Sequence, residues 1–177
     1  MEFYINYDNN YKINLSPDYI YLNLSDDTLE EALNFLGKEG TVSAAIMPYD
    51  AQDIPSSTKS TAKFKIKHFL HVFKAAQPAR SKIFNTRKAL MRGNPVLVEM
   101  KVPTNFESLK SIKNYVPSGD ANTKKEILTV VSYDADLEAF EVQGTWGNQW
   151  GTNGYLWIDY ADYAKMVTDG FVLVPEF

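Results

Sequence analysis

The segment from Gly144 to Tyr155 constrains the fold of this chain more than any other part of its sequence. From Trp146 onwards it follows the pattern Trp-Gly-x-x-Trp-Gly-x-x-Gly-Tyr, and chance rarely places two tryptophans and three glycines at these offsets. Strand-like segments flank it at residues 139–143 and 155–158. The segment is therefore expected to connect two strands of an antiparallel sheet.

Helical patterns come early in the chain. Phe3, Tyr4, Tyr7 and Tyr11 recur at spacings of three and four, which predicts the last turns of an amphipathic helix. Ser16 is expected to cap a short helix that begins at Pro17. A further helix is expected to open at Asp26 or Asp27 and to end at Gly40.

Strand patterns dominate the rest of the chain. A strand-like alternation of Phe64, Ile66 and Phe69 precedes a helix over residues 83–91, and further strands are expected at residues 96–102, 127–133, 139–143, 155–158 and 171–174. Helices followed by an antiparallel sheet predict the α+β class. The 177 residues are expected to form a single domain, with residues 1–60 mainly helical and residues 61–177 mainly antiparallel sheet.

Composition excludes several classes of function. The net charge of −4 gives no broad positive field, so nucleic acid is not an expected partner. No apolar run is long enough to span a membrane, and the start of the chain has no signal-peptide pattern. The chain is expected to be soluble, and cytoplasmic if Met1 is the native start. It contains no cysteine, which excludes disulfides and a thiol nucleophile supplied by this chain.

The segment around Trp146 resembles the C-terminal signature of papain-like (C1-type) cysteine peptidases, in which a strand ends in Asn-Ser-Trp-Gly and continues through Trp-Gly to Asn-Gly-Tyr. Further matches occur in the order seen in bacterial members, at residues 15–21, 32–40, 48–49 and 93–96. The resemblance covers nearly the whole chain. It implies a papain-like fold whose central helix, which carries the catalytic cysteine, is truncated because the chain would start partway along it.

Active members of that family need a Cys nucleophile, a His that pairs with it, an Asn that orients the His and a Gln that helps to hold the oxyanion. The resemblance puts the Cys and the Gln before Met1, Glu126 at the His position and Gly144 at the Asn position. A carboxylate raises the pKa of a nearby thiol, and glycine has no side chain with which to orient a base. No catalytic residue is therefore expected.

The expected binding residues are all aromatic. In the family, residues matching Trp146 and Trp150 line the primed side of the substrate cleft, so these two indicate either a retained peptide groove or core packing, of which packing is favoured. The truncated helix is expected to leave an apolar surface lined by Phe3, Tyr4, Tyr7 and Tyr11. A partner is expected to cover this surface.

No metal site or other cofactor is expected. His68 and His71 lie three residues apart on a predicted strand, and Asp159, Asp162 and Asp169 lack the spacing of a calcium loop. The basic residues Lys63, Lys65, Lys67, His68 and Lys74 are interpreted as the solvated face of that strand.

These observations favour a non-catalytic papain-like pseudo-peptidase that binds another protein, or a second copy of itself, as a regulator, inhibitor or immunity-type protein. One alternative is the C-terminal fragment of a larger cysteine-peptidase-like protein, inert alone. A third hypothesis, a hydrolase with unorthodox residues, would use Glu126 as its base.

Overall fold

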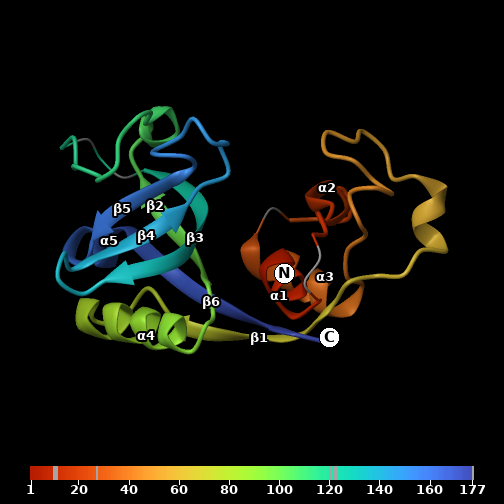
Figure 1. Cartoon of the computed structure of the whole chain (residues 1–177), viewed down its shortest axis with the longest axis horizontal. Coiled ribbons are helices and arrows are strands. Elements are labelled where there is room, and N and C mark those ends of the chain that lie inside the picture. Colours follow the sequence, from red (N-terminus) through yellow and green to blue (C-terminus); the bar gives the residue numbers. More distant parts are fainter. Residues whose placement is uncertain (10–11, 27, 120, 122, 177) are drawn as a thin grey trace. The chain divides into compact units, whose positions relative to one another are not determined.

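The computed structural model describes residues 1–9, 12–26, 28–119, 121 and 123–176. Its helices (Figure 1) are α1 (Glu2–Asn9), α2 (Pro17–Tyr21), α3 (Leu29–Lys38), α4 (Ala79–Met91) and α5 (Tyr160–Met166), with 3₁₀ turns η1 (Ser56–Lys59) and η2 (Phe106–Ser108). Its strands are β1 (Ile66–Phe73), β2 (Val96–Val102), β3 (Lys124–Asp134), β4 (Ala139–Gln143), β5 (Tyr155–Asp159) and β6 (Val167–Pro175). None of the described helices is long and apolar enough to cross a membrane.

The strands form one sheet in the order β1-β6-β2-β3-β4-β5. The neighbouring pairs from β6 to β5 all run antiparallel. The predicted α+β class and papain-like fold are confirmed. Strands β2 and β4 have the predicted bounds. The side chains of β2 alternate between buried and more exposed, and in β4 the buried Phe140 and Val142 alternate with Glu141 and Gln143.

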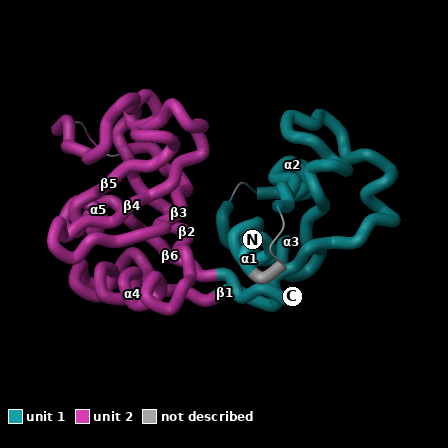
Figure 2. The backbone as a smooth tube through the Cα atoms, in the orientation of Figure 1, with its two compact units in different colours: residues 1–69, 173–177 teal, residues 70–172 magenta. Residues whose placement is uncertain are grey.

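Two compact units divide the chain (Figure 2). Unit 1 contains residues 1–69 and 173–177, and unit 2 contains residues 70–172. Each unit is described by itself below. The single domain with a boundary after residue 60 stays a prediction.

Unit 2 has a core of aliphatic and aromatic side chains on the sheet strands, η2, α5 and the segment Gly144–Tyr155. Phe140 and Tyr163 are buried against one another, with ring centroids 4.5 Å apart. Helix α4 covers this core with Ile83 and Leu90. Its buried Lys82 donates a hydrogen bond of 2.8 Å to the carbonyl oxygen of Val167, just past the end of α5. Burial lowers the pKa of the Lys82 ammonium, and the charge of Asp169 partly opposes that shift.

Unit 1 is held by small helices whose ends are capped. The Ser16 hydroxyl accepts a hydrogen bond from the Tyr19 amide, so the predicted cap of α2 is confirmed. Helix α3 buries Leu33 and Leu36 and is followed by Gly40, whose positive φ of 81° confirms the predicted stop.

The predicted start of α3 at Asp26 or Asp27 is wrong, and Asp27 itself lies outside the described residues. The N-cap is Thr28, whose hydroxyl accepts from the Glu31 amide. The Glu31 carboxylate in turn accepts from the Asp26 amide, at 2.7 Å. The Thr28 hydroxyl thus satisfies the amide of the third helical residue, as in a capping box, while the Glu31 carboxylate reaches an amide two residues before the cap.

Helix α5 was not predicted from the sequence. It buries Tyr160, Tyr163, Ala164 and Met166 within seven residues. Ala161 and Lys165 are exposed on its other side, but seven residues are too few for an amphipathic period to stand out in a sequence window of about 11 to 18 residues. Asp159 precedes it without a capping hydrogen bond.

Three of the five basic residues expected on the face of a strand lie outside β1, since Lys63 and Lys65 precede it and Lys74 follows it. Lys63 places its ammonium over the Tyr19 ring, 4.5 Å from the centroid, and also donates to the Thr58 carbonyl. Lys65 donates to the carbonyl oxygen of Lys38 at 2.6 Å. Both ammonium groups therefore anchor loops of unit 1, whereas Lys67 and His68 are exposed on the strand.

Candidate functional site

The connection between β4 and β5 is a rigid loop. Gly151 has a φ of 56°, and a Cβ there would lie 2.1 Å from the carbonyl oxygen of Tyr155. Only glycine is accommodated so close to the backbone. Gly144 and Gly154 close the base of the loop through a backbone hydrogen bond of 3.1 Å.

Trp150 anchors this loop to the core of unit 2. Its side chain is 1% exposed, and its indole nitrogen donates a hydrogen bond of 2.8 Å to the carbonyl oxygen of Phe106. Trp146 is partly buried and packs against Trp150 with ring centroids 5.0 Å apart. Trp150 thus acts as a packing residue with a satisfied polar group, whereas Trp146 keeps some of its ring exposed.

Gly144 lies directly beneath the two indoles. A Cβ built at Gly144 would lie 2.7 Å from an atom of the Trp150 ring and 2.8 Å from an atom of the Trp146 ring. These distances are well below van der Waals contact, and the buried ring of Trp150 has no room to move away. The direction in which a side chain at position 144 would project is therefore filled by tryptophan.

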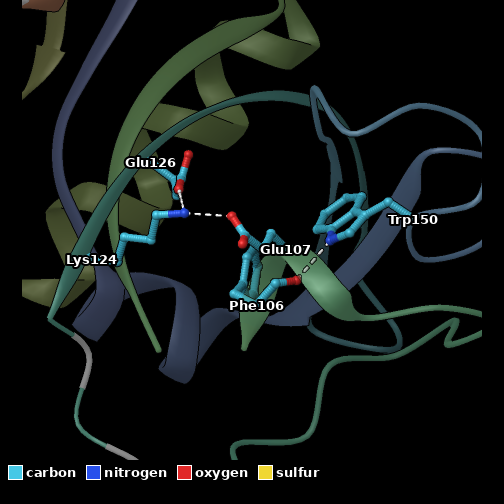
Figure 3. Close-up of polar contacts among 5 residues, drawn as sticks. All are labelled: Phe106, Glu107, Lys124, Glu126 and Trp150. Atoms are coloured by element: carbon cyan, nitrogen blue, oxygen red, sulfur yellow. Dashed lines mark hydrogen bonds and ion pairs between the residues drawn. The ribbon is translucent and has the colours of Figure 1, made fainter. Parts of the chain in front are cut away.

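Glu126 is held in a small ion-pair network (Figure 3). The Lys124 ammonium lies 2.8 Å from a Glu126 carboxylate oxygen and 2.5 Å from one of Glu107. Hydrogen bonds to the Glu107 and Glu126 carboxylates raise the pKa of Lys124 to about 12. The ammonium stays charged at neutral pH, so the Glu126 carboxylate faces a permanent cation.

Glu126 and Gly144 are not opposite one another in the sheet. Glu126 pairs with Met100 of β2, while the pairing of β3 with β4 ends at Thr129 opposite Gln143. Gly144 comes one residue after Gln143, and Glu126 comes three residues before Thr129. Glu126 and Gly144 therefore share no strand pair.

The N-terminal aromatics belong to unit 1. Phe3 is 50% exposed and Tyr7 is 79% exposed, and their rings stack with centroids 6.0 Å apart. The predicted helix is present as α1, but its fully buried residue is Ile5. Tyr4 packs edge-on against Phe3, and Tyr11 lies outside the described residues. Unit 2 holds Trp146 and Trp150, so the six predicted binding residues are divided between the units.

Sequence reasoning missed two residues, one in the ion-pair network of Glu126 and one in the contact of Trp150. Glu107 lies on η2, and Phe106 beside it accepts the Trp150 hydrogen bond. Figure 3 shows that η2 brings both contacts together. No local pattern marks Glu107, because its partner Lys124 lies 17 residues later in the chain.

A polar hollow of ≈ 470 Å³ lies on the outer side of the Trp-Gly loop. Ser111 and Asn153, both at φ 56°, contribute to its wall in a left-handed conformation that is uncommon for side-chain-bearing residues. Its full lining is Lys110, Ser111, Asn148, Gln149, Gly151, Thr152 and Asn153. The lining contains a single charged residue and no carboxylate.

The other candidates show no shared site. In the part of the chain that the structure describes, no three histidine or carboxylate side chains are grouped as a metal would require. His71 packs on the Phe171 ring at 4.6 Å, and Asp162 pairs with Lys165 at 3.3 Å.

Comparison with known proteins agrees with the fold described above. The family model of the papain family cysteine proteases matches residues 25–171. Xylellain, a cysteine protease from Xylella fastidiosa, is 19% identical with a TM-score of 0.73, and the match covers 96% of this chain and 74% of that chain. The proform of the Amb a 11 cysteine protease, a ragweed pollen allergen, is 15% identical with a TM-score of 0.76, over 98% of this chain and 56% of that chain.

A third similar structure is a cysteine protease from Carica candamarcensis in complex with E-64. It is 15% identical with a TM-score of 0.70, and the match covers 98% of this chain and 83% of that one. At these identities the structural likeness concerns the fold alone. The chain spans little more than half the length of the Amb a 11 proform. No curated protein matches the sequence.

Proposed function

Since the chain belongs to the papain family of cysteine proteases, we propose that it is a non-catalytic member that acts by binding another protein. The observation that carries the proposal is the close approach of Trp146 and Trp150 to Gly144. A residue that orients a catalytic base needs a side chain, and the space for one is occupied by the two indoles. The chain also supplies no thiol, because it contains no cysteine.

The ion pairs of Glu126 argue against a replacement chemistry at the same place. A general base needs a carboxylate that is free to reach its substrate, whereas the Glu126 carboxylate is held by a lysine ammonium. The Lys124 ammonium lies 2.8 Å from Glu126, and Glu107 completes the network on the far side of the lysine. We therefore assign Glu126 a structural role in this ion-pair network and no proton transfer.

Exposed aromatic side chains support a role in binding. Phe3 and Tyr7 present stacked rings on α1, and aromatic residues are enriched at the centres of protein interfaces. We assign the module the role of a regulator, an inhibitor or an immunity-type protein, because each acts by occupying a partner without turnover.

The first experiment tests the absence of catalysis. The purified chain is incubated with a fluorogenic peptide library and with an epoxide inhibitor, next to a Glu126→Ala variant. The expected result is no cleavage and no covalent adduct. Cleavage that disappears in Glu126→Ala would instead establish the hydrolase hypothesis.

The second experiment tests binding. The tagged chain is used to capture proteins from its producing organism, and cross-linking with mass spectrometry maps the contact. A Phe3→Ser/Tyr7→Ser variant is compared with a Tyr21→Ser/Tyr49→Ser variant, whose tyrosines are also exposed in unit 1. Loss of the partner with the first variant alone supports the proposal. A chain that stays monomeric and captures nothing supports an inert portion of a larger protein.

A further inference from the structure

Helix α4 presents an outer face that combines bulky apolar and cationic side chains. Phe84 is 62% exposed and Met91 is 71% exposed, although both are large and apolar. Arg80 and Lys88 are exposed on either side of Phe84 at spacings of four, so these four residues lie on one side of the helix. We call the surface of Arg80, Phe84, Lys88 and Met91 the α4 face.

The charges on this helix are all of one sign. Its sequence, ARSKIFNTRKALM, contains four cations and no carboxylate, in a chain whose net charge is −4. Among the described residues, neither Arg80 nor Lys88 forms an ion pair. Arg87 at the margin of the face is held over the Tyr133 ring, 5.2 Å from its centroid, which keeps that edge rigid.

The exposed side chains of Phe84 and Met91 are not needed to attach α4 to the core of unit 2. Ile83, Ala89 and Leu90 already pack on the core of unit 2. Thr86 and Lys82 are buried and hydrogen-bonded on the same side. The helix is therefore fully anchored without Phe84 or Met91, and those two side chains contribute little to the stability of the unit.

We propose that the α4 face is a docking surface for an acidic segment of a protein partner, with Phe84 and Met91 as its apolar contacts. Arg, Met and Phe are the residue types enriched at protein interfaces, and unpaired cations favour a partner with clustered Asp and Glu. The proposal deepens the proposed function by naming the chemistry of the partner, and it rests on that function only in requiring a protein ligand.

A lipid surface fits this face less well. A helix that lies in a membrane interface buries a continuous apolar side in the lipid, whereas the α4 face offers only Phe84 and Met91 as apolar contacts, between cations. Nucleic acid is disfavoured because two of the four residues of the α4 face are apolar, and the remaining cations are too few for strong counterion release.

The size of the face sets the expected affinity. Thirteen helical residues span about 20 Å, and one side of such a helix offers less than the roughly 800 Å² per partner of a stable complex. The contact is expected to be transient, with a dissociation constant on the order of 10 μM. Charge pairing at exposed side chains makes it weaken as salt increases.

The test uses a displayed library of random 15-residue peptides, selected on the immobilised full chain. Selected peptides are synthesised and their affinities are measured by fluorescence anisotropy at low and high salt. The variants are Arg80→Glu/Lys88→Glu and Phe84→Ser. The matched control is Lys110→Glu/Lys113→Glu, which makes the same change in charge at exposed lysines beside the polar hollow.

The expected peptides are rich in Asp and Glu and carry at least one bulky apolar residue. Both α4 variants should weaken them by at least about tenfold, and the control by less than about twofold. Circular dichroism and urea midpoints of the variants should match those of the parent, because all the substituted side chains are exposed.

Selected peptides without an acidic bias, or affinities that the α4 variants leave unchanged, would overturn the proposal. The proposal would also be overturned if no peptide is selected and the chain instead binds phosphatidylserine vesicles or a 20-base-pair duplex, with binding that Arg80→Glu/Lys88→Glu abolishes. If the chain captures a host protein yet selects no acidic peptide, the proposed function stands and the α4 face is excluded as its docking surface.

Discussion

The indole nitrogen of Trp150 donates a 2.8 Å hydrogen bond to the carbonyl oxygen of Phe106, a residue 44 positions earlier in the chain. The two rings also pack, with centroids 5.6 Å apart. This contact ties the Trp-Gly loop to η2, the turn that supplies Glu107 to the network of Lys124 and Glu126. One tryptophan therefore supports both the loop and the turn that supplies Glu107 to the Glu126 network.

Replacing Trp150 with phenylalanine should destabilise the protein by about 2–4 kcal/mol, because the change leaves a cavity and a buried carbonyl without a donor. Urea unfolding followed by circular dichroism measures the loss. Trp157→Phe is the matched control, since Trp157 is only half-buried on β5, and it should cost about 1 kcal/mol or less. Equal losses in both variants would contradict the anchoring role of Trp150.

Gly144→Ala should destabilise the protein by about 1–3 kcal/mol, because the new methyl group overlaps two packed indole rings. Gly37→Ala provides a control of opposite sign. Gly37 lies in α3, where a Cβ would meet its nearest atom at an ordinary 3.7 Å, and alanine favours a helix by roughly 0.5–1 kcal/mol. Thermal unfolding of both variants tests the prediction, which a neutral Gly144→Ala would refute.

The Lys124 network should matter for pKa more than for stability. Glu107→Gln and Glu126→Gln should each lower the pKa of Lys124 from about 12 towards its ordinary value, with the larger change in Glu107→Gln, whose hydrogen bond is the leading cause of the shift. NMR titration of the lysine side chain measures it. Because these ion pairs are exposed to solvent, which screens them, the unfolding free energy should hardly change.

The sign of the pH dependence follows from that raised pKa. A lysine bound more tightly to its proton in the folded state stabilises the fold below its unfolded pKa, and the contribution is lost as pH rises towards about 12. Unfolding free energies should therefore show no contribution from Lys124 to pH dependence between pH values of about 6 and 9. A difference between parent and Glu107→Gln that varies within this window would contradict the assignment.

Lys82 should show the opposite pH dependence. Burial lowers the pKa of its ammonium in the folded state, so the unfolded chain binds the proton more tightly and stability rises with pH as the group deprotonates. Relative to Lys82→Met, the parent protein should gain stability as pH rises towards the pKa of the unfolded lysine. Urea unfolding across the alkaline range measures this difference. A difference that is independent of pH would show that the ammonium is better solvated than its 7% exposure indicates.

Local patterns in the sequence predicted much of the fold. Alternating side chains gave the bounds of β2 and β4, and Ser16 before Pro17 gave the start of α2, because these signals arise between near neighbours in the chain. The Trp-Gly segment indicated the family through glycines that the close backbone contact at Gly151 requires. The lack of a thiol is likewise a property of the sequence itself.

Only the tertiary structure decided what surrounds Glu126 and Gly144. The ion pairs of Lys124 depend on η2 lying beside β3, and the filled space at Gly144 depends on how two indoles stack. The outward position of Phe84 on α4 depends on which side of that helix the core takes. The ion pairs of Lys124 and the outward position of Phe84 arise from contacts between segments far apart in the chain. The indoles beside Gly144 are near it in sequence, but Trp150 is held by its hydrogen bond to Phe106, 44 residues earlier. Such long-range contacts leave no periodic trace in the residues themselves.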